Sequence, residues 1–339
     1  MQQYFGELIA IAVAVSWTFT ALFFEFAGNR IGSLAVNLLR LVFAFFLLGG
    51  LLYFTTGSFL PASADGKTWL WMSLSGLVGF VFGDLCLFYS YILITARFSQ
   101  LLMTLAPPFA ALFGWIMLGE NLSPMGFLGM AVTLTGIAIS ILKKGGKTQP
   151  SGSQPGSSQS SGDGQIKDET LIAGVSNMRG IHLHLPLKGV LLGLGGALGQ
   201  GLGIVLSKIG MNHYADAAQG TEVASYIPFA ATQMRIITGV IGFALIIFLT
   251  GRRALLTTGI KDRKAVAAIF MGAIFGPFVG VSLSLMAVQH TNTAIASTIM
   301  ATTPIIILIP YVLLYKKRIS PIEILGAILS VAGVSLFFM

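Results

Sequence analysis

The sequence predicts an all-α integral membrane protein with ten transmembrane helices, arranged as two inverted repeats of five helices. Three observations support this prediction. First, 55% of the 339 residues are hydrophobic and only 9% are charged, whereas a soluble domain carries about 25% charged residues. Second, the apolar residues gather in long blocks, and a helix needs about 20 such residues to cross a bilayer. Third, the later blocks repeat the glycines and prolines of the earlier ones.

Ten apolar blocks make up most of the chain, and mostly short polar segments separate them. Such short connections suit helices that run antiparallel to their neighbours. No basic segment precedes the first block, so we expect a membrane span there rather than a cleavable signal peptide. The expected spans are residues 5–26, 33–55, 69–92, 97–118, 124–142, 188–208, 225–249, 265–288, 293–315 and 321–339.

One long polar segment, residues 143–186, divides the blocks into two sets of five. Its central part is rich in Gly, Ser, Pro and Gln, which cannot bury enough apolar surface to fold. We therefore expect a first five-helix repeat over residues 1–142, a flexible linker over 143–186 and a second repeat over 187–339.

The two sets are related in sequence. Residues 68–142 align with 265–339 without a gap, at a constant offset of 197. Glycines and prolines in register carry the comparison, since membrane composition alone produces apolar matches. The first span of each half aligns at an offset of 183 and the second at 195. The matched pairs include Gly79 with Gly276, Gly83 with Gly280, Met103 with Met300, Pro107 with Pro304, Gly136 with Gly333, and Arg40 with Arg235.

The odd number of spans in each half has a geometric consequence. The second half must enter the membrane from the opposite side, which makes the repeat inverted. In transporters, inverted repeats place the binding site near the bilayer midplane, between the halves. Such a fold has two near-equivalent arrangements and can open alternately to each side.

Several motifs, in their order and their doubling, carry a resemblance to a known family. They are Trp17; Arg40 with Arg235; Leu105-Ala106-Pro107; Leu118-Gly119-Glu120-Asn121-Leu122-Ser123; Gly129 and Gly136; and Thr303-Pro304, Ser320-Pro321, Gly326 and Gly333. The chain resembles the EamA-type, ten-span members of the drug/metabolite transporter superfamily over nearly its whole length except the linker. It departs from them in its long linker and in Lys316-Lys317-Arg318, which stands where the first half has Gly119-Glu120-Asn121. The resemblance implies secondary transport of a metabolite or drug-like solute, often outward, and leaves the solute open.

Asp84 is the most informative single residue, because it lies well inside the third expected span. A charge at the bilayer centre costs at least about 2.5–3.5 kcal/mol on insertion scales, so Asp84 must face a cavity or a partner. Two interpretations stay open. Asp84 carries a proton or binds a cationic group, helped by Phe88 and Tyr91 on the same helix face, or it forms a structural ion pair.

The other polar residues of the spans give further candidates for the solute path. Arg40 and Arg235 either contact a carboxylate or phosphate or extend to the lipid headgroups. Trp17 and Tyr91 are candidates for lining the path. Gln200, which aligns with Trp17, and Gln233 either line the path or join helices by hydrogen bonds. We interpret a further group, near the span ends, as interfacial: Glu7, Glu25, Glu120, Lys208 and Glu323.

Small residues and prolines predict how the helices pack. Gly195, Gly199 and Gly203 lie four apart on one helix face, which lets helix backbones approach closely in lipid. A dinucleotide-binding loop is not favoured there, because the strict glycine spacing and a preceding strand are missing. Pro107 and Pro304 fall in the middle of expected spans, so we expect them to bend those helices, either structurally or around a central cavity.

The sequence argues against several other classes of protein. No P-loop motif indicates ATP use, and no cluster of His, Asp or Glu indicates a metal site or enzyme activity. Cys86 is the single cysteine, so no intrachain disulfide forms.

We expect no cofactor, and we expect no nucleic-acid partner because the basic residues flank apolar blocks. The expected partners are the lipid bilayer, a small solute and, if transport is coupled, a proton, and a monomer is compatible with the sequence. The rivals are an exchanger of phosphorylated or nucleotide-linked sugars, a passive channel and a membrane-embedded enzyme.

The charges of the loops predict an orientation in the plasma (inner) membrane. Basic residues crowd the odd-numbered loops, and basic loops favour the cytoplasm. This places the linker in the cytoplasm and both termini outside, although members of the superfamily are commonly drawn with their termini inside. The basic residues concerned are Lys143, Lys144, Lys147, Lys188, Arg252, Arg253, Lys261, Arg263, Lys264, Lys316, Lys317 and Arg318.

Overall fold

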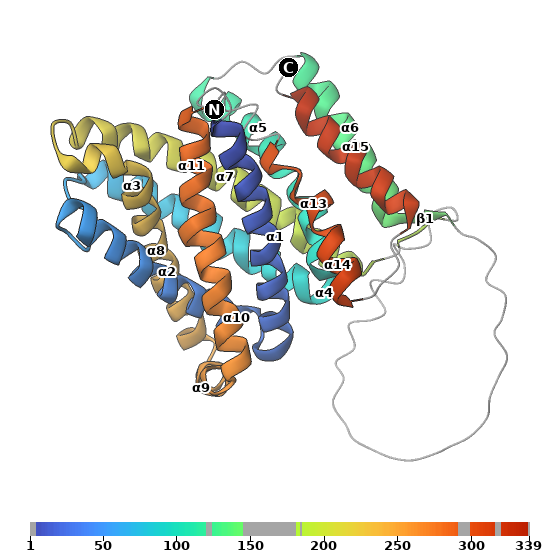
Figure 1. Ribbon diagram of the computed structural model, residues 1–339, viewed down its shortest axis with the longest axis horizontal. Helices are drawn as coiled ribbons and strands as arrows, with labels where there is room; N and C mark the ends of the chain where they lie inside the picture. Colours follow the sequence, from blue (N-terminus) through green and yellow to red (C-terminus); the bar gives the residue numbers. More distant parts are fainter. Residues whose placement is uncertain are drawn as a thin grey trace.

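A computed structural model describes residues 5–119, 124–144, 181–183, 185–290, 299–315 and 320–337, and almost all of them are helical (Figure 1). The elements are α1 (Phe5–Ile31), α2 (Ser33–Thr56), α3 (Gly66–Ser75), the π-helical segment η2 (Gly76–Gly83), α4 (Asp84–Met103), α5 (Ala106–Leu118), α6 (Pro124–Ile141), β1 (Leu142–Lys144), β2 (Ile181–Leu183), α7 (Leu187–Ala217), the short 3-10 helix η3 (Glu222–Tyr226), α8 (Ile227–Leu249), α9 (Arg253–Lys261), α10 (Arg263–Ala273), the π-helical segment η4 (Ile274–Gly280), α11 (Val281–His290), α13 (Thr303–Ile306), α14 (Leu308–Tyr315) and α15 (Pro321–Phe337).

Helix lengths agree only in part with the ten expected spans. Six helical stretches are long and apolar enough to cross a membrane. They are residues 5–31, 33–56, 66–103, 187–217, 222–249 and 263–284. Four further apolar helices are shorter and cover residues 106–118, 124–140, 303–313 and 321–336.

The chain bends next to Pro107 and Pro304 through a break in the helix just before each proline. A tight turn at residues 104–105, whose backbone N–H groups bond to carbonyls three residues back, ends α4, and α5 then begins one residue before Pro107. A turn at residues 301–302 likewise precedes α13, whose second residue is Pro304. Proline is well tolerated in the first turn of a helix, because the missing N–H has no partner there in any case. The prolines therefore start helices after a break, which explains why these spans are divided. Residues 291–298, at the start of the expected ninth span, lie outside the described residues.

The chain reverses sharply at Thr95, between the expected third and fourth spans. Thr95 has φ 71° and ψ 157°, which no helical residue adopts. The reversal brings residues nine apart into contact, since the Ser90 and Ser99 hydroxyls lie 2.7 Å apart. Across the same turn, Gln100 Nε2 donates a 2.8 Å hydrogen bond to the Tyr91 hydroxyl.

The helix ends define two ends of the molecule. At the linker end, α1 and α6 end and α2, α7, α10 and α15 begin. At the opposite end, called the terminal end here, α1 begins and α15 ends (Figure 1). The short strands β1 and β2, which the sequence did not predict, pair antiparallel from Leu142 opposite Leu183. Helix α9 also lies at the linker end and was not expected.

Contacts between the halves are reciprocal. Helix α7 packs on α3, η2 and α4 as α1 packs on α10, η4 and α11. Gly79 lies against Gly203, and its aligned partner Gly276 lies against Thr20, the residue that aligns with Gly203. Gly83 lies against the backbone of Gln200, and Gly280 against Trp17, in the same correspondence. The two π-helical segments, residues 76–83 and 274–280, also fall in register at the offset of 197.

Helices α6 and α15 form a separate reciprocal pair. Gly136 lies directly against Ser330, whereas Gly333 lies directly against Thr133. At the offset of 197, Gly136 aligns with Gly333 and Thr133 with Ser330. The same contact between aligned residues therefore occurs twice, once from α6 to α15 and once from α15 to α6. The Thr133 hydroxyl also lies 3.3 Å from the Ser330 carbonyl oxygen, as its donor.

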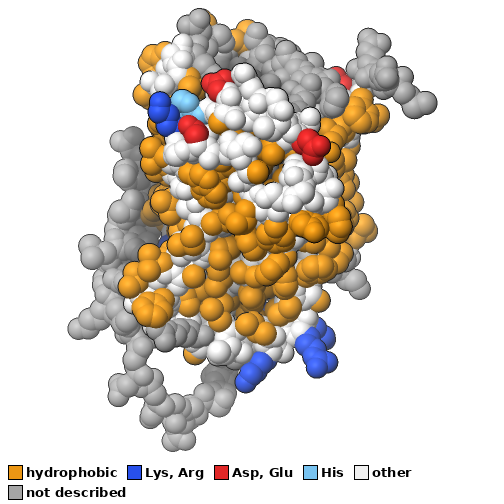
Figure 2. Space-filling model, turned by 90° about the vertical axis from the view of Figure 1, so that its left-hand side faces the viewer, with side chains coloured by type: hydrophobic (Ala, Val, Ile, Leu, Met, Phe, Trp, Pro, Cys, Tyr) orange, Lys and Arg blue, Asp and Glu red, His pale blue; other side chains and the backbone are white. Residues whose placement is uncertain are grey.

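The outer surface is that of a membrane protein. Large apolar side chains point outward along the bundle, with Phe54 and Leu313 exposed at 87% and 71%. On one face, a broad apolar belt separates charged side chains at the top from charged side chains at the bottom (Figure 2). Side chains of this kind are stable next to lipid and costly next to water, and the protein is therefore a multi-pass membrane protein.

Candidate functional site

A cavity of about 280 Å³ lies between the halves. Much of its lining consists of aligned positions, one from each half: Trp17 and Gln200, Phe80 and Pro277, Asp84 and Val281, Met103 and Met300, Thr104 and Ala301, Ala106 and Thr303, Pro107 and Pro304. The helix breaks before Pro107 and Pro304 thus both face the cavity. The site lies where the two repeated sets of elements meet.

An ion pair lies in the wall of this cavity. Arg40 Nη2 donates to Asp84 Oδ2, and both side chains are almost fully buried. Gln200 Nε2 donates a 2.6 Å hydrogen bond to the second carboxylate oxygen of Asp84. Asp84 is the first residue of α4, directly after η2, whose Gly79 and Gly83 let α7 come close enough for Gln200 to reach the carboxylate.

The guanidinium of Arg40 is enclosed by aromatic rings. It lies 4.7 Å from the ring centre of Phe88, 5.7 Å from that of Phe80 and 5.8 Å from that of Phe24. Its Nε donates a 3.1 Å hydrogen bond to Asn37 Oδ1. Aromatic faces attract a cation, and most strongly when water is excluded. Arg40 is therefore held from several sides and does not extend to the headgroups.

Arg235 is also buried, so the headgroup interpretation is wrong for both arginines. Its guanidinium lies 4.4 Å from the ring centre of Phe80, the ring that it shares with Arg40. Phe80 lines the cavity and Arg235 does not. The aligned arginines thus occupy different environments, one in the cavity wall and one behind it.

The remaining predicted residues divide into those that the cavity brings together and those that it does not. Trp17, Tyr91 and Gln200 line the cavity with Asp84 and Arg40. Gln233 does not, because it is fully buried and its Nε2 donates to the Phe45 carbonyl at 3.1 Å. It joins α8 to α2, which was the alternative interpretation of its amide.

The glycine face of α7 packs against η2 and α4. A Cβ at Gly199 would lie 2.7 Å from the Cα of Gly83, and one at Gly203 would lie 2.9 Å from the Cα of Gly79. A Cβ at Gly195 would make a tight contact of 3.3 Å with Cys86 Sγ. These glycines therefore let α7 pack closely against η2 and α4, the elements that carry part of the cavity lining.

Several polar residues were missed by sequence reasoning. Asn37, Gln100 and Thr104 touch the pair or line the cavity, and neither their spacing nor their charge drew attention to them. Glu25 was expected at the interface, but it is only 4% exposed and accepts a 2.8 Å hydrogen bond from the Tyr311 hydroxyl. Position near a span end was the wrong criterion here, because the end of α1 is covered by α10, α4 and α14.

Outside the spans, Asp262 caps α10 at the linker end. Its carboxylate accepts a 2.7 Å hydrogen bond from Arg30 Nε and further ones from the backbone N–H groups of Lys264 and Ala265. The hydrogen bond from Arg30 is the largest cause that lowers the pKa of Asp262, followed by the one from Ala265. The pair fastens the end of α1 to the start of α10.

The site is suited to reversible binding of an organic solute. Aromatic and apolar walls surround one ion pair and the amides of Gln100 and Gln200, which is the usual composition of a small-molecule site. Over the part of the chain that is described, no three His, Cys, Asp or Glu side chains are grouped to hold a metal ion.

The chain is similar in sequence to a known protein family and in fold to a solved structure. The family model of the EamA-like transporter family matches residues 4–142 and again residues 187–339. No curated protein sequence matches the chain significantly. One solved structure, described as "Crystal structure of protein", is 14% identical and covers 98% of this chain and 95% of its own, with a TM-score of 0.56. That likeness shows a shared fold. Because the family match includes both halves of the chain, the protein belongs to the EamA-like transporter family, within the drug/metabolite transporter superfamily.

Proposed function

We propose that the protein is a ten-span secondary transporter, which moves a small metabolite or drug-like solute, in the outward direction, by alternating access. The observation that carries the proposal is the cavity lining, much of which consists of aligned residues from both halves. A site on the axis that relates two similar halves can be exposed to either side when the halves tilt. Membership of a transporter family supports the same activity.

The shorter helices are part of the proposed ten spans. Helix α6 has 18 residues and α15 has 17, which gives lengths of about 27 and 26 Å, close to the 30 Å hydrocarbon thickness. Helix α5 completes a span with the residues of α4 that follow Thr95. If all ten cross, the two five-helix repeats, 1–142 and 187–339, have opposite orientations.

Asp84, Arg40 and Gln200 are the proposed centre of solute binding. Asp84 cannot receive a cationic group or a proton while Arg40 holds it, so the solute or the proton must compete with Arg40 for the carboxylate. After that exchange, the guanidinium of Arg40 still contacts the aromatic rings and donates its hydrogen bond to Asn37. A cavity with one balanced ion pair favours a solute that is neutral or carries both charges.

The sugar-phosphate exchanger fits this site less well. Such a solute carries at least two negative charges and needs several cations. Among the described residues that line the cavity, Arg40 is the single cation and is already paired. Arg235 lies behind Phe80, and Lys208 is exposed.

We propose that the linker faces the cytoplasm and both termini face outward across the plasma (inner) membrane. Of the charged side chains visible on the face drawn in Figure 2, those at the lower, linker end are basic, whereas the upper end shows acidic side chains together with basic ones. Basic ends favour the cytoplasm. A peptide tag inserted at residues 152–162 should be inaccessible to antibody on intact cells, and labelling of intact cells contradicts this orientation.

Flux into liposomes tests the function. Wild-type protein, Asp84→Asn and the control Asp216→Asn, which makes the same change at an exposed site, are compared on a panel of amino acids, amines, sugars and nucleosides. We expect saturable flux that Asp84→Asn abolishes and Asp216→Asn preserves. Flux driven by an imposed pH gradient supports proton coupling, and flux that is indifferent to the gradient supports uniport or exchange. Non-saturable flux without counterflow identifies a channel, chemical conversion of the solute identifies an enzyme, and unchanged flux in Asp84→Asn contradicts the role of Asp84.

A further inference from the structure

A second polar cluster lies at the linker end, outside the cavity. It consists of Glu25 in α1, Arg97 in α4, Tyr311 in α14 and Glu323 in α15. The Tyr311 hydroxyl donates a 2.8 Å hydrogen bond to Glu25 Oε1. Arg97 Nη1 lies 3.0 Å from Glu323 Oε2 in an ion pair, and the Arg97 guanidinium lies 5.3 Å from the ring centre of Tyr311. Four elements thus meet through three side-chain contacts.

Each of these contacts joins the first half of the chain to the second. Glu25 and Arg97 precede the linker, whereas Tyr311 and Glu323 follow it. Tyr311 is 1% exposed and Glu25 4%, so their hydrogen bond lies inside the protein, whereas the side chains of Arg97 and Glu323 are 14% and 17% exposed and their ion pair lies near the surface. Contacts of this kind restrain the halves against moving apart at this end.

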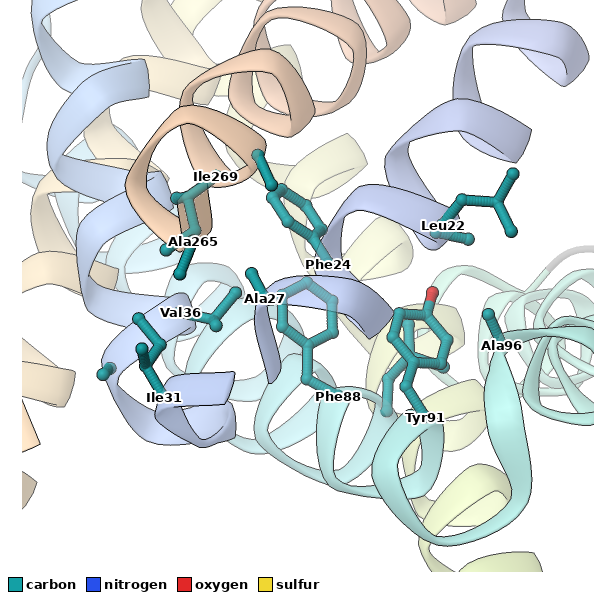
Figure 3. Close-up of a cluster of buried hydrophobic side chains, with 14 of the residues drawn as sticks. Leu22, Phe24, Ala27, Ile31, Val36, Phe88, Tyr91, Ala96, Ala265 and Ile269 are labelled. Atoms are coloured by element: carbon teal, nitrogen blue, oxygen red, sulfur yellow. The ribbon is translucent and has the colours of Figure 1, made fainter. Parts of the chain in front are cut away.

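The cluster lies directly beneath the cavity. Phe24, Phe88 and Tyr91 line the cavity and also belong to the apolar cluster that contains Tyr311. Figure 3 shows the three rings next to one another, with Phe24 above Phe88 and Tyr91 to the right of Phe88. Phe24 and Phe88 lie with ring centres 4.9 Å apart, and Phe88 and Tyr91 5.3 Å apart. These rings form the part of the cavity lining that also contacts Tyr311, and the polar cluster joins the helices that carry them.

The reversal at Thr95 places Arg97 in the cluster. Thr95 is a non-glycine residue at positive φ, a conformation that persists only where the surrounding structure imposes it. Arg97 follows two residues later, and Gln100, one turn further on, holds the Tyr91 hydroxyl. The same short segment therefore contacts both the cavity floor and the other half.

The sequence gives this cluster no counterpart at the terminal end. At the offset of 197, Tyr311 aligns with Gly114 and Glu323 with Gly126, and at 183 Glu25 aligns with Lys208. Glycine can supply neither the hydroxyl nor the carboxylate. The residue that aligns with Arg97 lies outside the described residues. The two ends thus differ in the residues that fasten them, even though the helix packing is reciprocal.

We propose that Glu25, Arg97, Tyr311 and Glu323 form a latch that holds the cavity closed toward the linker end and must break when the transporter opens there. The proposal rests on the proposed transport by alternating access. The four are positioning residues: they touch no solute, and they decide which end of the cavity is open. Because the aligned positions do not repeat these residues at the terminal end, the latch favours the state that is closed toward the linker.

Pulsed electron paramagnetic resonance on protein in lipid nanodiscs tests the latch. In a Cys86→Ser background, spin labels at Asn29→Cys in α1 and Leu313→Cys in α14 report the separation across the Glu25–Tyr311 bond. We expect one short distance in the parent. Tyr311→Phe and Glu323→Gln should each raise the population with a longer distance at least about tenfold. The control Glu222→Gln, an exposed change of the same kind, should leave the distribution unchanged.

A double-variant cycle separates a latch from general loosening. If Arg97 and Glu323 act together, Glu323→Gln should have little further effect in an Arg97→Gln background. The proposal is overturned if Tyr311→Phe and Glu323→Gln, both still monodisperse, keep the parent distribution, or if the effects of Arg97→Gln and Glu323→Gln simply add. Solute flux is measured on the same samples. A shifted distance distribution in a protein that transports nothing on the panel supports the latch and contradicts the proposed function.

Discussion

Removing Arg40 should destabilise the protein more than removing the whole ion pair. Arg40→Met leaves the buried carboxylate of Asp84 with Gln200 as its remaining side-chain donor. Breaking a buried pair in this way costs about 3–5 kcal/mol, because one charge stays buried without its partner. The double variant Arg40→Met/Asp84→Leu removes both charges and fills similar volume, so its free energy of unfolding should return to within about 1–2 kcal/mol of the wild type.

The free energy of unfolding is measured by titration with a denaturing detergent in mixed micelles. The control is Arg30→Met, which breaks the exposed pair with Asp262, and exposed pairs contribute little. An Arg40→Met effect as small as that of the control would refute the reasoning about the buried charge. So would a double variant that is less stable than Arg40→Met. The double variant should also lose solute flux while it stays folded, which separates the role of the pair in stability from its role in transport.

Two further predictions concern helix contacts. Gly203→Leu should lower the free energy of unfolding by at least about 1–3 kcal/mol, because a Cβ there meets the Cα of Gly79 at 2.9 Å and overpacking has this cost. The control is Gly50→Ala, because nothing lies within 4 Å of a Cβ at Gly50. Equal effects of the two changes would contradict the packing argument. Asp262 has a lowered pKa in the folded protein, so its contribution to stability is present above about pH 4 and is lost as the pH falls through the lowered pKa. Stability measured against pH should therefore lose a small part of its acid dependence in Asp262→Asn, and an unchanged profile would contradict the lowered pKa of Asp262.

Composition and register were enough to predict a helical membrane protein and to identify Asp84 as a residue that must have a partner or face a cavity. A lone acid inside an apolar span must have a partner or a cavity, and Asp84 has Arg40 as a partner in the wall of a cavity. The glycines in register indicated where backbones approach, as at Gly79 and Gly203. These inferences need only the chain itself and the solvent around it.

Other features depend on which distant helices meet, and the sequence does not contain that information in readable form. Gln233 and Gln200 looked alike as intramembrane amides, yet one joins α8 to α2 and the other reaches the cavity. Glu25 has the position of an interfacial acid, and the packing of distant helices around it, with Tyr311 from 286 residues away as a hydrogen-bond donor, makes it a buried one. The helices are apolar on most sides, so periodicity does not identify the face that carries a site.

The reciprocal contact between α6 and α15 has a consequence for the origin of the chain. When two helices pack through the same aligned residues in both directions, the contact surface is complementary to itself, as in a two-fold dimer. A single five-helix unit that carries such a helix can therefore pair with a second copy of itself through Gly136 or Gly333. Joining two copies by a tether raises their effective concentration into the millimolar range. Gene duplication and fusion would then preserve the contact at any protein concentration, and each copy becomes free to diverge, as Asp84 and Val281 have done.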